Sequence, residues 1–207
     1  MLYLKAPSEY PVIVPTTALG LALVEFFDAV KEFYEDDTKG TFKVIVFGGC
    51  AVHVHTQARG SADIDAELDV GHLHREDVIA VLAGEETFTF LDDDGTYQQL
   101  ELDGNFSNAL GPLHEDYTDR LIRLHTEDAT PYVQVYVASA IDVAISKLGR
   151  FGDRDIDDIV KLLSLPGESV EVFERLAKEA IDYYPCDSVR VIGNLNVALR
   201  EYWESQP

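Results

Sequence analysis

The spacing of apolar residues divides the chain at about residue 138. Before this point, helical stretches with apolar residues every three or four positions are interspersed with short β-branched or alternating stretches typical of strands. After it, the spacing is helical throughout. The elements predicted for the first part are helices over 16–36, 49–57 and 74–84, strands over 42–49 and 62–69, and hairpins over 87–103 and 120–139. Those predicted for the second part are helices over 139–150, 154–164, 168–183 and 187–204.

Capping and turn residues support these boundaries. Thr16 and Thr17 are both suitable N-caps for the first helix, and Gly40 is a suitable terminator. Asp94-Gly95 is a typical two-residue hairpin turn. The second hairpin is expected to turn near 128–131, and the later helices are separated by Gly152, Pro166-Gly167 and Pro185. We therefore expect an α+β fold in which a mixed sheet flanked by helices (1–138) is followed by a helical C-terminal part (139–207).

Composition narrows the class of protein. The 207 residues are enough for a large hydrophobic core, and 38 acidic against 16 basic residues give a formal net charge of −22. Such a chain repels nucleic acid at long range, so DNA is not an expected partner, and RNA would require a local cluster of cations. No apolar run is long enough for a membrane span, the N-terminus lacks the pattern of a signal peptide, and two cysteines fit a reducing compartment. These features predict a cytoplasmic protein with no membrane partner.

The stretch "VFGGCAVHVHTQARGSADIDAELD" carries the clearest chemistry. Gly48 and Gly49 end the predicted buried strand, where a helix starting at that point could bind a phosphate with its free N–H groups. Asp63 and Asp65 are two apart, so on a continuous strand they share one face, where their mutual repulsion favours a divalent cation such as Mg²⁺. The alternative is a tight turn followed by an ordinary solvated strand. His53 and His55 lack a ligand quartet, which argues against zinc, and Cys50 fits a buried thiol.

A second group of charged residues lies around the predicted break at Gly152. Lys147, Arg150 and Arg154 are three cations close together in an acidic chain, which indicates either a phosphate-binding cluster or surface ion pairs. Asp155 and Asp158 fall in the first turns of the next helix, where the helix dipole favours acids. Upstream, the Ser139-x-x-Asp142 pattern is typical of a capping box and indicates a structural role for both residues.

The two regions together resemble the minimal nucleotidyltransferases of the DNA polymerase β-like superfamily. "GGCAVHVHTQARGSADIDAELD" is similar to their Gly-Gly…Asp-x-Asp signature, and "RGSADID" looks most like the toxin-type branch, which includes abortive-infection E toxins and toxins that modify transfer RNA ends. "VASAIDVAISKLGRFGDRDIDDIVKLL" resembles the downstream signature of that branch, with Lys147 and Arg154-Asp155-x-x-Asp158. The two blocks cover about a quarter of the chain.

The resemblance implies a catalytic core over 1–138, with 139–207 completing the active-site cleft, and a role for each motif residue. Asp63 and Asp65 would bind Mg²⁺ or Mn²⁺, and Asp155 or Asp158 would assist near the nucleotide or the acceptor. The residues expected at the nucleotide are Gly48, Gly49, Ser61, Arg59, Lys147, Arg150 and Arg154. The superfamily's third metal-binding carboxylate would be Asp103 or Glu101, and their spacing does not decide between them.

Three functions follow from this reading. The first is a pyrophosphate-releasing transfer of a nucleoside monophosphate from an NTP to RNA, such as the 3′ end of tRNA, by a toxin with an antitoxin partner or a role in phage defence. The second is transfer to a small molecule or a protein side chain, which the acidic charge favours. The third is a non-catalytic nucleotide-binding relative.

Overall fold

The computed structural model describes residues 4–33, 41–58, 60–71, 73–84, 87–107, 109, 111–128 and 130–206. Its strands are β1 (Val12–Ile13), β2 (Phe42–Val46), β3 (Asp63–Ile64), β4 (Ala66–Asp69), β5 (Phe88–Leu91), β6 (Tyr97–Leu102), β7 (Ile122–Leu124) and β8 (Val133–Val137). Its α-helices are α1 (Ala18–Asp28), α2 (Gly48–Thr56), α3 (Arg75–Ala83), α4 (Ala140–Lys147), α5 (Asp153–Leu163), α6 (Val170–Asp182) and α7 (Ser188–Ser205). Within the described residues this is a mixed α/β structure, which confirms the predicted fold class.

The larger sheet is built around β2. Its strand order is β1-β7-β8-β2-β4; β2 runs parallel to β8 and antiparallel to β4, with Val44 opposite both Val135 and Leu68. The side chains of Phe42, Val44, Ile45 and Val46 are fully buried. The β-branched run therefore forms a central strand covered on both faces, as its composition predicts.

A smaller sheet, in the order β3-β6-β5, contains the predicted hairpin over 87–103. The single strand predicted over 62–69 is wrong, because the chain divides at Asp65. Asp63 and Ile64 pair with β6, whereas Ala66–Asp69 pair with β2 in the larger sheet. The carbonyl of Asp65 accepts the N–H of Phe47 at 2.8 Å, so this residue lies at the point where the chain passes from one sheet to the other.

The first helix is shorter than predicted. Thr17 is its N-cap and accepts the N–H of Gly20, which selects one of the two predicted caps. The helix ends at Asp28, where the chain makes a tight turn: the N–H of the fully buried Val30 donates to the carbonyl of Phe27. A 3₁₀ turn follows over Lys31–Phe33. The predicted terminator Gly40 lies outside the described residues. The strand predicted over 42–49 ends at Val46, because both glycines belong to α2.

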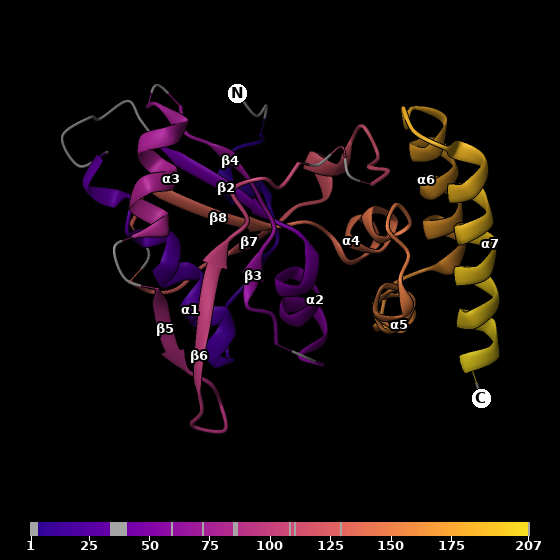
Figure 1. The fold of residues 1–207 in the computed structure, drawn as a ribbon, viewed down its shortest axis with the longest axis horizontal. Helices are drawn as coiled ribbons and strands as arrows, with labels where there is room; N and C mark the ends of the chain where they lie inside the picture. The colour runs from indigo at the N-terminus through magenta and orange to yellow at the C-terminus, as the bar shows by residue number, and fades with distance from the viewer. Residues whose placement is uncertain are drawn as a thin grey trace.

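The C-terminal helices follow their predicted bounds closely. Figure 1 shows α6 and α7 at one end of the molecule, the sheets with α1 and α3 at the other, and α4 and α5 between them. Helices α4 and α5 both contact α2, so the helical part packs directly against the helix that starts with the two glycines. Among the described residues, no helix combines the length and the apolar character that crossing a bilayer requires.

Candidate active site

The turn from β2 into α2 requires glycine for a reason visible in the structure. Gly48 has a φ of +58°, a left-handed conformation that favours glycine. A Cβ atom at this position would also collide with the carboxylate of Asp65. The first N–H groups of α2 have no acceptor within the helix, and they begin beside this carboxylate. The close approach of backbone and carboxylate therefore brings a helix N-terminus, whose N–H groups suit a phosphate, next to a candidate metal ligand.

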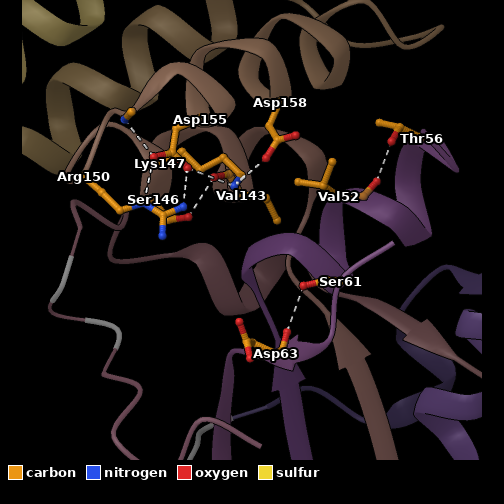
Figure 2. Close-up of polar contacts among 11 residues, drawn as sticks. Val52, Thr56, Ser61, Asp63, Val143, Ser146, Lys147, Arg150, Asp155 and Asp158 are labelled. Carbon is orange, nitrogen blue, oxygen red and sulfur yellow. Dashed lines mark hydrogen bonds and ion pairs between the residues drawn. The ribbon is translucent and has the colours of Figure 1, made fainter. Parts of the chain in front are cut away.

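The two aspartates of the Asp-x-Asp motif have different surroundings. Asp63 is exposed, and its backbone carbonyl accepts hydrogen bonds from Ser61 Oγ at 3.1 Å (Figure 2) and from the buried Cys50 thiol at 3.4 Å. Asp65 is half-buried, and burial raises its pKa. The negative charges of Asp103 and, more weakly, Asp63 raise the pKa of Asp65 further, while Lys147 and Arg150 oppose them. Carboxylates and cations thus act together on Asp65.

The structure distinguishes the two candidates for a third carboxylate. Glu101 is exposed and pairs with Asp63 in the sheet register. Asp103 follows the end of β6, is half-buried, and is the charged neighbour with the largest effect on the pKa of Asp65. Asp103 is therefore the better placed of the two to share a cation with Asp65.

Two of the three cations predicted to cluster, Lys147 and Arg150, meet at the α4–α5 junction, whereas Arg154 lines a larger cleft. Lys147 ends α4, and its ammonium group lies 2.9 Å from Asp158 and 3.4 Å from Asp155 (Figure 2). The side chains of these three residues are at most 5% exposed. Arg150 binds Asp155 through two hydrogen bonds of 2.8 and 2.9 Å, although its side chain is 77% exposed. The cluster is thus a buried ion-pair network with one cation reaching into solvent.

Asp155 both caps its helix and pairs with two cations. Its carboxylate caps α5 by accepting the N–H of Gly152 at 2.9 Å, and it also binds the two cations. Burial alone would raise the pKa of Asp155, but the hydrogen bonds from Arg150 and Gly152 and the charge of Lys147 outweigh burial and lower it to about 2. A carboxylate with such a pKa is a poor general base, so its chemistry is to hold the cations in position.

Two adjoining cavities collect the predicted residues. A cleft of about 810 Å³ is lined by Gly49, Ser61, Asp63, Asp65, Glu101, Asp103, Arg150 and Arg154, among others. A smaller cavity of about 140 Å³ is lined by Gly48, Asp65, Lys147, Arg150 and Asp155 together with apolar side chains. Asp65 and Arg150 line both, so the two blocks that are some eighty residues apart in the sequence meet at these side chains.

Other candidate residues have structural partners or lie elsewhere. Arg59 is outside the described residues. His53 bonds Thr17 Oγ1, and His55 bonds the carbonyl of Ala138, which ties both rings to the scaffold. Ser139 caps α4 by accepting the N–H of Asp142 on its hydroxyl, and the same hydroxyl donates to the Asp142 carboxylate. That buried carboxylate binds Arg120 at 2.7 and 2.9 Å, which gives Asp142 a structural role.

The donor set is compatible with a hard divalent cation, although it is incomplete. Among the described residues, no three His, Cys, Asp or Glu side chains converge closely enough to hold a metal ion by themselves. Asp63, Asp65 and Asp103 offer only oxygen, which Mg²⁺ prefers, and Mg²⁺ usually takes one or two carboxylates plus phosphate oxygens and water. Such a cation would offset the repulsion that the charges of Asp103 and Asp63 exert on the Asp65 carboxylate. The residues therefore fit a metal that arrives with a triphosphate.

Sequence reasoning missed two features of the site: the aromatic lining of the smaller cavity and the burial of the predicted residues Asp155 and Asp158. Phe47 and Phe106 form part of the smaller cavity, and an isolated aromatic residue in a loop gives no pattern to detect. Asp155 and Asp158 lie on the buried face of α5 with Ile159 and Leu162. The sequence held a signal for this burial, because the two acids occupy core-facing positions of an amphipathic helix. A buried carboxylate requires a charged or hydrogen-bonding partner, so such positions indicate an ion pair.

The fold is a mixed sheet flanked by helices, and the helix that starts with two glycines begins beside an aspartate. This arrangement is an α+β fold of the nucleotidyltransferase type. The chain belongs to the family described as "Nucleotidyltransferase of unknown function (DUF6036)", whose model matches residues 22–206. Comparison with curated proteins and with solved structures found no match. The family confirms the resemblance to nucleotidyltransferases; the toxin-type branch, the metal and the acceptor stay predictions.

Proposed function

We propose that the protein transfers a nucleoside monophosphate from an NTP to an acceptor hydroxyl, with a divalent cation and release of pyrophosphate. The observation that carries this proposal is the meeting of Gly48, Asp65 and Arg150 at the junction of the two cavities. This junction combines helix N–H groups for phosphate, carboxylates for a metal and an exposed guanidinium. Membership of a nucleotidyltransferase family supports the same general reaction.

In this mechanism the chain's own residues bind and orient the nucleotide. The N–H groups at the start of α2 donate to the triphosphate, as helix N-termini do. Arg150 uses Nε and Nη2 to bind Asp155, which fixes the guanidinium plane, and Nη1 would contact a phosphate oxygen. Lys147 would add positive charge at the wall of the smaller cavity, where Asp155 and Asp158 hold its ammonium group in place.

The carboxylates would hold the metal. Asp63 and Asp65, with Asp103, would bind Mg²⁺ or Mn²⁺ together with phosphate oxygens. The chemistry that such a cation supplies when bound is charge neutralisation at the triphosphate, polarisation of the α-phosphorus and a lower pKa of the acceptor hydroxyl. The acceptor hydroxyl gives its proton to solvent and its oxygen bonds to the α-phosphorus, while the bond from that phosphorus to the bridging oxygen breaks and pyrophosphate leaves.

Two acceptor classes each have a supporting observation. The resemblance of the motif blocks to tRNA-modifying toxins favours a tRNA 3′ end, with Arg154 and Arg150 as the basic contacts and an antitoxin as partner. The net charge of −22 favours a small molecule or a protein side chain, because a long polyanion is repelled by this surface.

The test is a transfer assay with labelled NTPs. Each of the four nucleotides is incubated with Mg²⁺ and with tRNA, total protein or a small-molecule extract, and pyrophosphate release and the labelled product are measured. Asp63→Ala and Asp65→Ala should abolish transfer, while Asp182→Ala, an exposed acid at the end of α6, should not. Labelled tRNA would identify the first acceptor class, and labelled protein or small molecule the second. Pyrophosphate release at background with every nucleotide and acceptor would refute the proposal.

A further inference from the structure

The smaller cavity has two chemically different walls. One wall consists of the charged and backbone groups of the candidate site, among them Gly48, Asp65 and Lys147. The opposite wall is apolar and consists of Phe47, Phe106 and Leu113. A nucleoside triphosphate has the same division, with a charged tail and a flat aromatic head. The apolar wall therefore suits the flat head of such a ligand, and the charged wall, which continues into the adjoining cleft through Asp65 and Arg150, suits its tail.

Phe106 is the aromatic ring available on the apolar wall. It stacks on Phe47 with ring centroids 5.6 Å apart and an interplanar angle of 27°. Phe47 is buried, with 2% exposure, whereas Phe106 is half-buried while lining the cavity. One side of the Phe106 ring is therefore supported by Phe47, while the residue lines the smaller cavity and also a second hollow beside Glu67 and Arg75. A supported ring at the edge of a cavity is a platform on which a base can stack at little cost in side-chain entropy.

The chain fixes this ring relative to the candidate metal ligands. Asp103 accepts the N–H of Asn105 on its side chain at 2.9 Å and the N–H of Phe106 on its carbonyl at 3.1 Å. One turn thus carries both the third carboxylate and the stacking ring. Further along, Gly111 lies so close to the carbonyl of Ser146 that a Cβ atom would collide with it, which holds the segment against the end of α4.

We propose that the base of the NTP binds in this smaller cavity by stacking on Phe106, with the triphosphate extending past Asp65 and Arg150 into the larger cleft. This inference rests on the proposed function and adds the residue that holds the base. Stacking on an aromatic ring reads the face of a base and not its hydrogen-bonding edge. Phe106 therefore supplies affinity that is common to all four nucleotides.

The experiment compares Phe106→Leu with Phe106→Tyr. Leucine keeps an apolar side chain but removes the ring face, and tyrosine keeps the ring. Titration calorimetry with Mg²⁺ should show each NTP binding about 5- to 150-fold more weakly to Phe106→Leu and near-normally to Phe106→Tyr, since base–aromatic stacking contributes about 1–3 kcal/mol. A 2-aminopurine riboside triphosphate should be quenched on binding to the native protein and less quenched at saturation with Phe106→Leu.

Two controls separate a base platform from a merely structural ring. Inorganic tripolyphosphate has no base, so its affinity should be the same for the native protein and for Phe106→Leu. Tyr97→Leu removes an aromatic ring that is 77% exposed on the β5–β6 hairpin, and it should leave NTP binding unchanged. Equal losses for tripolyphosphate and NTP in Phe106→Leu, or unchanged NTP binding, would overturn the inference.

The outcome is independent of the outcome of the transfer assay. Active transfer with unchanged NTP affinity in Phe106→Leu would refute the base platform and leave the proposed function intact. Ring-dependent NTP binding without pyrophosphate release would support the platform and refute the transferase. If none of the four NTPs binds the native protein, the inference fails.

Discussion

Removing the charge of Lys147 should destabilise the protein more than almost any other substitution of a lysine in the chain. The ammonium group is 2.9 Å from Asp158, and the two side chains are 5% and 1% exposed, so solvent screens the pair very little. Lys147→Met keeps the length of the side chain but leaves the buried Asp158 and Asp155 carboxylates without this cation. Breaking a buried ion pair by removing one partner costs about 3–5 kcal/mol. That is a large fraction of the roughly 5–15 kcal/mol by which a domain is stable.

Urea unfolding followed by circular dichroism measures this loss. With a slope of about 2–3 kcal/mol per molar urea, the midpoint should fall by about 1–2.5 M in Lys147→Met. Lys161→Met, which removes an exposed lysine on α5, should change the free energy of unfolding by less than about 0.5 kcal/mol.

A double-mutant cycle tests the stated cause. Asp158→Asn in the Lys147→Met background should cost less than Asp158→Asn in the native protein, with a coupling energy of about 1–3 kcal/mol. Additive losses, or a cost below about 1 kcal/mol for Lys147→Met, would refute the conclusion that this ion pair stabilises the α4–α5 junction.

The remaining predictions concern backbone and protonation. Gly48→Ala should abolish nucleotide transfer, because its Cβ would displace the Asp65 carboxylate, and transfer at the native rate would contradict this expectation. Gly193→Ala, which has open space around it on α7, should instead raise the free energy of unfolding by about 0.5–1 kcal/mol. Burial lowers the pKa of His55 below its ordinary 6.5, although the hydrogen bond to Ala138 opposes this. Stability should therefore fall as the pH drops below about 6.5 and the unfolded chain takes up the proton, and the NMR titration midpoint of this ring should lie below 6.5. The pKa of Asp155 is about 2, below that of an unfolded aspartate, so its stabilising effect is complete above pH 4 and is lost only between about pH 4 and 2. The difference in unfolding free energy between the native protein and Asp155→Asn should therefore be constant from pH 5 to 8. A change of that difference across this range would contradict the pKa.

The elements of this fold were predictable where one physical preference dominates. The run from Phe42 to Val46 forms a strand as expected, and α4 to α7 follow their apolar spacing. Asp65 shows where such reasoning fails, because local alternation predicts one strand while hydrogen bonding to two different sheets divides it. Long-range pairing leaves no mark on local spacing.

The candidate site was predictable to a similar degree. Glycines and aspartates in a motif identified the carboxylate side, and the charges near Gly152 identified the cationic side. Phe106 belongs to neither pattern, since its position depends on the turn at Asp103 and on the ring of Phe47. Likewise, spacing could not rank Asp103 above Glu101; burial and the field at Asp65 could.

The change of sheet at Asp65 gives the site a mechanical property. Asp63 belongs to the hairpin sheet and Ala66 to the central sheet. A rotation of one sheet against the other would therefore change the backbone conformation at Asp65. The far end of the hairpin is tethered to another element, since Asp93 accepts the N–H of Ala18 at the start of α1. The tether therefore connects α1, through β6, to the strand that carries Asp63, while Ala66 is held by β2. The relative position of the two acids thus depends on contacts outside the cleft as well as on the residues that line it.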